Sequence, residues 1–241
     1  MTLILAILIG YLLGSVPFGM VLTRMAGKGD IRTVGSGNIG ATNVLRTGSR
    51  PLALAVLLLD GAKGAVPVLA INAWAGLEPA LMAGIAAMSG HLFPIWLRLG
   101  SIGDIVRAIA VLIAVAIALA VIVSAPEIRW VGAIVLGLAA LVAWGGKGVA
   151  TGLGVLAGVG WPIGVVAALT WLAAAALFRR SSIGALAAFV VAPVYCVVFE
   201  ATIITQFAVL VTAFVFVRHR DNIARLIRGS EPKIDGGRKP T

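Results

Sequence analysis

The sequence predicts an all-α polytopic membrane helical bundle of about nine spans, with the amino terminus outside the cell and the carboxyl terminus in the cytoplasm. Hydrophobic residues make up 61% of the 241 positions, and the mean hydropathy is +1.09. Only 12% of the residues are charged, about half of the ~25% found in soluble domains. Lipid is therefore the solvent for most of the chain.

Apolar stretches recur along the chain at lengths that approach the ~20 residues of a membrane-crossing helix. They lack the alternating pattern of a barrel strand, so helices are the remaining way to cross a bilayer. Tilt or local thinning of the bilayer can accommodate the shorter ones. The stretches are Leu3–Val21, Leu52–Ala73, Leu81–Leu97, Ile105–Val123, Val131–Trp144, Val149–Gly160, Ile163–Phe178, Ile183–Phe199 and Ile203–Val217.

Lysine and arginine gather in the loops on one side of these stretches. By the positive-inside rule that side is cytoplasmic. The net charge of +10 then reflects topology and attraction to anionic lipid, and nucleic acid is not an expected partner. The basic loop residues are Arg24, Lys28, Arg32, Arg46, Arg50, Arg98, Lys147, Arg179, Arg180, Arg218, Arg220, Arg225 and Arg228.

A long polar loop, residues 27–50, follows the first span. Gly35, Gly37 and Gly40 permit backbone conformations in which amide groups converge on an anion. The alternative is a flexible loop whose glycine spacing matches a dinucleotide-binding fingerprint by chance, since no strand precedes it. Hydroxyl, amide and guanidinium groups suited to a phosphate are present on Ser36, Asn38, Thr42, Asn43 and Arg46.

Two charged residues, Asp60 and Lys63, interrupt the second span. Each charge costs about 2.5–3.5 kcal/mol on insertion scales, so such residues usually face a functional cavity. Their i, i+3 spacing lets them pair on one helix face. We expect Lys63 to hold a phosphate with Asp60 positioning it, and the alternative is a self-neutralising pair that specifies helix packing.

The sixth span opens with Gly145-Gly146-Lys147-Gly148. Glycine amides, the positive end of a helix dipole and a mobile cation together suit a phosphate. The Walker A spacing is incomplete, so nucleotide hydrolysis is not supported. Close helix packing with a snorkelling lysine is the alternative.

These segments together resemble the acyl-phosphate:glycerol-3-phosphate acyltransferase family of bacterial membrane enzymes. The resemblance rests on the following segments, in this order: Gly14–Gly19, Asp30–Thr47, Leu59–Gly64, Gly90–Leu97, Gly146–Thr151, Arg180–Ser182 and Arg218–Pro232. It covers most of the chain outside residues 100–144.

The resemblance implies transfer of a fatty acyl group from acyl phosphate to the 1-hydroxyl of glycerol 3-phosphate. Lysophosphatidic acid and inorganic phosphate are the implied products, and neither acyl-CoA nor acyl carrier protein is the donor. No metal or organic cofactor is implied. The implied catalytic residues are Ser36, Lys147, His219 and Asn222, and the implied phosphate and substrate contacts are Gly35, Gly37, Asn38, Thr42, Asn43, Arg46, Lys63, Gly146 and Ser182.

Residues 100–144 depart from the family pattern, which has seven spans and runs almost directly from the third span into Gly-Gly-Lys-Gly. We interpret them as an inserted hydrophobic helical hairpin, natural or engineered. The predicted organisation is a membrane core over residues 1–99, this hairpin, the remaining core over 145–217 and a basic cytoplasmic tail over 218–241. An even number of added crossings would return Lys147 to the cytoplasmic side.

Two other functions fit parts of the sequence. A transporter or flippase for a phosphorylated metabolite or lysolipid would also use intramembrane lysines and broken helices, but the motifs cluster at one face and not at the midplane. A catalytically silent scaffold could retain the pocket and lose turnover through the insertion. The expected location in each case is the bacterial inner membrane.

Overall fold

The computed structural model describes residues 1–97 and 139–234, with single positions between residues 103 and 135. No strand occurs among these residues, and the predicted all-α class is confirmed. The helices of four or more residues are α1 (Thr2–Gly14), α2 (Phe18–Met25), α3 (Ala41–Val44), α4 (Arg50–Ala75), α5 (Leu77–Leu92), α8 (Val149–Val159), α9 (Trp161–Phe178), α10 (Ser181–Phe199), α11 (Thr202–Arg218) and α12 (Arg220–Ile227). Short 3-10 turns cover Ile31–Thr33, Leu45–Thr47 and Ile95–Leu97.

Five segments of the described chain are long and apolar enough to cross a membrane, so the protein is a multi-pass membrane protein. α11 becomes a sixth if it forms one span with α12, from which it is bent by 63°. α8 is apolar but has only 11 residues, roughly 17 Å of helix and about half of a bilayer core. Of the predicted stretches, most of Ile105–Val123 and part of Val131–Trp144 lie outside the described residues, so the count of nine stays a prediction.

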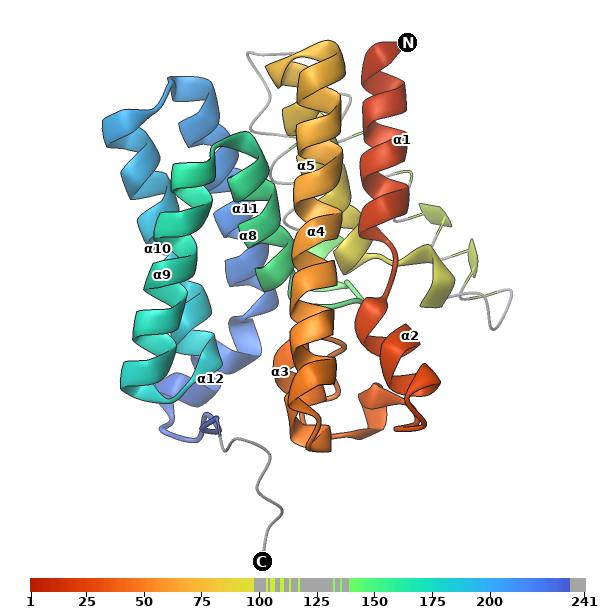
Figure 1. Cartoon of the computed structure of the whole chain (residues 1–241), viewed down its shortest axis with the longest axis vertical. Helices are drawn as coiled ribbons and strands as arrows, with labels where there is room; N and C mark the ends of the chain where they lie inside the picture. The colour runs from red at the N-terminus through yellow and green to blue at the C-terminus, as the bar shows by residue number, and fades with distance from the viewer. Residues whose placement is uncertain are drawn as a thin grey trace, which may run out of the picture.

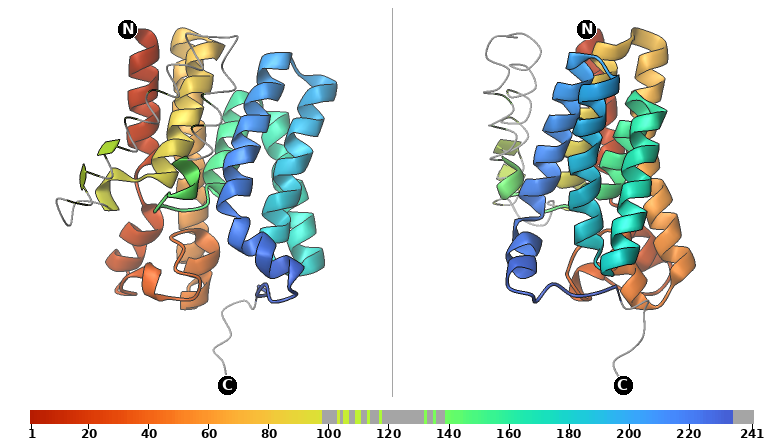
Figure 2. Two further views of the ribbon diagram at one scale, coloured as in Figure 1. Left: turned by 180° about the vertical axis from the view of Figure 1, so that it is seen from behind. Right: turned by 90° about the vertical axis from the view of Figure 1, so that its left-hand side faces the viewer.

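The helices stand side by side, with the amino terminus at one end of the bundle and α12 at the other (Figures 1 and 2). One end carries the loop of residues 26–50, the turn between α9 and α10 at Arg179–Arg180, and α12; we call it the basic end. The other end carries the amino terminus and the turns at Gly76, Gly160 and Glu200.

Small residues allow the helices to approach closely, as is usual where lipid removes the hydrophobic drive for association. A Cβ at Gly14 of α1 would overlap the backbone of Ala87 in α5. A Cβ at Gly154 of α8 would likewise overlap the backbone of Gly61 in α4. These contacts place α5 at the centre of the bundle, where 78% of its span is buried.

Three helices end short of the basic end, and their breaks bring polar groups inside the bundle. α1 stops at Gly14 ahead of Pro17, and α5 stops at Leu92 because the residue before Pro94 disfavours helical backbone. The Tyr11 hydroxyl donates to the carbonyl of Phe93 at 2.7 Å and ties the two breaks together. The third such helix, α8, begins beside them.

Candidate active site

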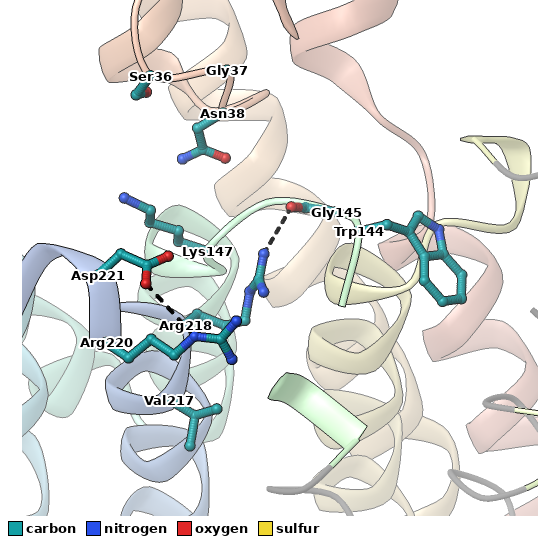
Figure 3. Close-up of a pocket in the computed structure, with 10 residues that line it drawn as sticks. All are labelled: Ser36, Gly37, Asn38, Trp144, Gly145, Lys147, Val217, Arg218, Arg220 and Asp221. Carbon is teal, nitrogen blue, oxygen red and sulfur yellow. Dashed lines mark hydrogen bonds and ion pairs between the residues drawn. The ribbon is translucent and has the colours of Figure 1, made fainter. Parts of the chain in front are cut away.

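A cavity of about 270 Å³ lies between the glycine-rich loop, the segment before α8 and the junction of α11 and α12 (Figure 3). Ser36 and Lys147, both expected to be catalytic, line this cavity although 111 positions separate them in the chain. Figure 3 shows the Lys147 side chain extending towards the loop that carries Ser36 and Asn38. The lining residues are Ser36, Gly37, Asn38, Trp144, Gly145, Lys147, Val217, Arg218, Arg220 and Asp221.

Asn43 of α3 holds the glycine-rich loop together from inside. Its Oδ1 accepts from the Ser36 amide at 3.0 Å and from the Arg46 guanidinium at 3.1 Å. Its Nδ2 donates to the carbonyls of Ile31 at 3.0 Å and Val34 at 2.8 Å. Asn43 is 1% exposed, so its role is to shape the loop and to fix the position of Ser36. Arg46 does not line the cavity and is linked to Ser36 through their shared acceptor on Asn43.

The glycines of this loop serve its backbone geometry. Gly35 and Gly37 have φ values of 55° and 68°, which side-chain-bearing residues rarely adopt. A Cβ at Gly35 would also lie 2.6 Å from Asn43 Oδ1. The amides of Ser36 and Gly37 donate to Asn43 and Val34 within the loop, so they are not the free anion-binding amides that the sequence predicted.

The segment before α8 is bonded to the end of α5. The amide of Gly145 donates to the carbonyl of Leu92 at 2.8 Å, and the amide of Gly146 donates to the carbonyl of His91 at 3.2 Å. A Cβ at Gly146 would overlap the His91 ring. Two of the amides expected to meet a phosphate are therefore used to fix the segment, and the lysine side chain is what it presents to the cavity.

Arg218, at the end of α11, holds the same segment from the opposite side. Its guanidinium donates to the carbonyls of Gly145 and Gly146, each at 3.3 Å. Figure 3 shows this side chain reaching across the cavity wall to Gly145. The arginine thus contributes both a cation in the wall and a support for the lysine segment.

Lys147 is connected to the carboxyl-terminal segment through a chain of hydrogen bonds. Its Nζ donates to Asn222 Oδ1 at 2.5 Å, and Asn222 Nδ2 donates to Glu231 Oε1 at 2.6 Å. Glu231 Oε2 accepts from Arg225 at 2.7 Å. Glu231 is 6% exposed, and the backbone around it is held to the α9–α10 turn by Arg180, whose Nε donates to the Glu231 carbonyl at 3.1 Å.

The surroundings shift the pKa values of Lys147 and Glu231, the two ionisable groups linked through Asn222. The pKa of Lys147 is lowered to about 8, mainly by burial and also by the positive charges of Arg225 and Arg218, against the opposing effect of Glu231. Burial alone would raise the pKa of Glu231, but hydrogen bonds from Asn222 and Arg225 bring it below its ordinary value. Glu231 is therefore ionised at neutral pH, and Lys147 is a cation that loses its proton in mildly alkaline solution.

His219 follows Arg218 directly after α11, is 3% exposed and does not itself line the cavity. Its Nδ1 is 2.8 Å from the carbonyl of Val215. Because a carbonyl can only accept, Nδ1 carries the proton in the neutral ring and Nε2 is left as an acceptor. Ser182, another expected contact, stands at the start of α10 beside Glu231 and does not line the cavity.

Lys63 and Thr42, two further expected contacts, do not line the cavity either. Lys63 pairs with Asp60 at 2.7 Å, as the spacing predicted, and its Nζ donates to the carbonyl of Val16 at 2.7 Å. Both side chains are 3% exposed, so this lysine neutralises a buried carboxylate and is not presented to the cavity. Thr42 lies in α3, behind the loop that forms the rim.

Sequence reasoning missed the two residues that connect the catalytic set. Arg218 was considered only as a topological charge. Glu231 falls inside the Arg218–Pro232 segment on which the resemblance rests. The sequence feature that could have identified it is a carboxylate that follows Arg225 and Arg228 closely enough to pair with one of them.

The sequence profile described as glycerol-3-phosphate acyltransferase matches this chain over residues 4–144 and 101–229. The chain belongs to this family. The acyltransferase is 44% identical to the glycerol-3-phosphate acyltransferase of Paramagnetospirillum magneticum, over 99% of this chain and 96% of the relative. It is also 44% identical to that of Mesorhizobium japonicum, over 96% of each chain. The family membership that the motifs predicted is confirmed, and a transporter is not favoured.

Two solved structures have the same fold as the acyltransferase. Both are of PlsY (YgiH), an integral membrane glycerol 3-phosphate acyltransferase, in a glycerol 3-phosphate form and a lysophosphatidic acid form. The first is 28% identical with a TM-score of 0.74, over 97% of this chain and 96% of the other. The second is 27% identical with a TM-score of 0.73, over 97% and 95%.

Proposed function

We propose that this acyltransferase moves a fatty acyl group from acyl phosphate to the 1-hydroxyl of glycerol 3-phosphate, forming lysophosphatidic acid and inorganic phosphate. The observation that carries the proposal is a single cavity in which Lys147 extends towards Ser36 and Asn38, and whose wall includes Arg218. A phosphorylated acceptor and a phosphate leaving group both need cations, and this wall supplies them. The two forms in which PlsY was solved carry the acceptor and the acylated product named here.

Each group in the cavity has a part in binding. Lys147 and Arg220 contribute positive charge, and Ser36 and Asn38 contribute hydroxyl and amide groups from the opposite rim. Groups fixed in place before the reaction stabilise charge on a departing phosphate. Arg46, held beside the rim by Asn43, completes the charge around the bound phosphates.

The reaction needs no covalent enzyme intermediate, because acyl phosphate is already activated. The acceptor oxygen forms a bond to the acyl carbonyl carbon, and the bond from that carbon to the phosphate oxygen breaks. The phosphate leaves with the bonding electron pair, opposite the cations of Lys147 and Arg218. The hydroxyl proton passes to the departing phosphate, which becomes inorganic phosphate, with His219 and Asn222 as positioning residues beside the wall.

We further propose that the cavity opens to the cytoplasm of a bacterial inner membrane. The concentration of Arg and Lys at the basic end supports the orientation. The hairpin expected over residues 100–144 lies largely outside the described residues and stays a prediction.

The test is turnover by the purified full chain with palmitoyl phosphate and glycerol 3-phosphate. Lysophosphatidic acid and inorganic phosphate should appear in equal amounts, and palmitoyl-CoA in place of palmitoyl phosphate should yield neither. Lys147→Ala should abolish the product, whereas Lys28→Ala, which removes an exposed lysine at the same end, should not. Product from palmitoyl-CoA alone would refute the proposed donor, and full activity of Lys147→Ala would refute the proposed site.

A further inference from the structure

A buried polar cluster lies directly behind the segment that carries Lys147. Its members, Asp60, Lys63 and His91, are each no more than 5% exposed and come from α4 and α5. None of them lines the cavity, and the mechanism above assigns no step to any of them. Buried charged groups are costly unless they are paired, so this cluster needs an explanation in terms of what it supports.

The cluster is neutralised internally. Lys63 Nζ lies 2.7 Å from Asp60 Oδ1 and donates to the carbonyl of Val16, in the break between α1 and α2. Asp60 Oδ1 also faces His91 Nδ1 at 4.0 Å. The carboxylate thus lies between a lysine that balances its charge and an imidazole that is beyond hydrogen-bond distance.

The other side of the His91 ring meets the lysine segment. The ring fills the space beneath Gly146 so closely that a Cβ on that glycine would overlap Nε2. The backbone carbonyls of His91 and Leu92 accept the amides of Gly146 and Gly145. The height of this segment above α5, and with it the place of Lys147, depends on what occupies the position of the ring.

We propose that His91 is a positioning residue for acyl transfer: its imidazole, packed between Gly146 and the buried Asp60, supports Gly146 and thereby holds Lys147 against Asn222 at the edge of the cavity. This inference rests on the proposed function of Lys147. His91 touches no reacting atom and acts only through the segment above it. A residue that merely filled space would be replaceable by any side chain of similar volume.

The first experiment separates positioning from packing. His91→Phe keeps a ring without polar atoms, and His91→Gln keeps a polar group without the ring. We expect kcat/KM with palmitoyl phosphate to fall at least tenfold in His91→Phe and to recover in part in His91→Gln, with thermal midpoints in detergent close to that of the unmodified protein. Ser89→Ala is the matched control, because Ser89 is buried on the same helix and bonds only the Ile85 carbonyl among the described contacts. Wild-type kcat/KM in His91→Phe would overturn the inference.

The second experiment does not need turnover. In a Lys147→Cys background, the rate of reaction with a small thiol reagent reports how the segment is held, while the native Cys196 is buried. Adding His91→Phe should change that rate at least threefold, and adding Ser89→Ala should not. An unchanged rate would overturn the inference even if the unmodified enzyme proved inactive with acyl phosphate, an outcome that would refute only the proposed function.

A third variant covers the case in which His91→Phe fails to fold. Gly146→Ala lifts the segment from the His91 side with the imidazole intact. It should lower kcat/KM by a similar factor, and normal activity in Gly146→Ala would contradict the dependence on this contact.

Discussion

The ammonium of Lys147 donates to the side-chain oxygen of Asn222 at 2.5 Å, joining the segment before α8 to α12 across 75 positions of the chain. The partner is an amide, so it orients the lysine without neutralising it. The amide is itself oriented, because its NH₂ group can only donate and finds the carboxylate of Glu231 at 2.6 Å. Lys147 thus keeps a full positive charge for an anionic substrate.

The alkaline limb of the pH profile should belong to Lys147. Burial lowers the pKa of this group to about 8, so the cation predominates below that pH and is lost above it. We expect kcat/KM for glycerol 3-phosphate to be level up to about pH 8 and to fall about tenfold per pH unit beyond it, because only the protonated lysine attracts phosphate. A bound phosphate favours the charged form of Lys147, so the decrease in kcat should occur at a higher pH than the decrease in kcat/KM.

Lys147→Arg provides the control for this assignment. A guanidinium does not titrate in the accessible range, so the limb should vanish from the kcat/KM profile even if the overall rate falls. A limb near pH 8 that persisted in Lys147→Arg would assign the titration to another group.

Removing the carboxylate of Glu231 should impair the site from outside the cavity. Glu231→Ala leaves the Asn222 amide and the Arg225 guanidinium without their acceptor, and the buried Asn222 amide left unpaired costs about 1–3 kcal/mol. We expect a lower thermal midpoint and at least a tenfold loss of kcat/KM, with Glu231→Gln intermediate because it keeps one acceptor oxygen. Glu200→Ala, at the opposite end of the bundle, should change neither quantity. Equal behaviour of the Ala and Gln variants would argue against the hydrogen bond to Asn222.

The glycine-rich loop should be intolerant of a nearly isosteric change at Asn43. In Asn43→Asp a carboxylate oxygen would replace the NH₂ group that donates to the carbonyls of Ile31 and Val34. Acceptors would then face acceptors in a site that is 1% exposed. We expect at least a hundredfold loss of kcat/KM and greater protease sensitivity within residues 26–50. Asn72→Asp, near the far end of α4, should be benign, and wild-type activity in Asn43→Asp would mean that the loop does not need this clamp.

The sequence predicted the helical class and the seven helical stretches described here because apolar length and composition decide them locally. It also identified the loop and the lysine segment, since glycines and cations inside a membrane protein need a reason. It could not assign the glycines correctly. In the sequence, Gly146 has the features of an anion-binding glycine. In the structure a glycine is needed there because a Cβ would overlap the ring of His91, which is 55 positions away in the chain.

The same limit applies to the charged residues. Lys63 and Lys147 look alike in sequence, and only the packing reveals that one neutralises Asp60 while the other faces the cavity. Glu231 was passed over because its partners, Asn222 and Arg225, meet it only after the segment following α12 folds back to the α9–α10 turn. Long-range contacts of this kind leave no periodic pattern to read.

The proposed orientation can be tested by cysteine labelling, because the single native cysteine, Cys196, is buried. Lys28→Cys places an exposed thiol at the basic end, and Glu78→Cys places one at the opposite end. In right-side-out spheroplasts a membrane-impermeant maleimide should label Glu78→Cys at once and Lys28→Cys only after the membrane is permeabilised. The positive-inside rule gives the expected sign, since at least eleven Lys and Arg positions gather at the basic end and a flipped chain would expose all of them outside. The reverse labelling pattern would place Ser36 and Lys147 on the outer side, away from cytoplasmic glycerol 3-phosphate, and the proposed reaction could not then draw on that pool.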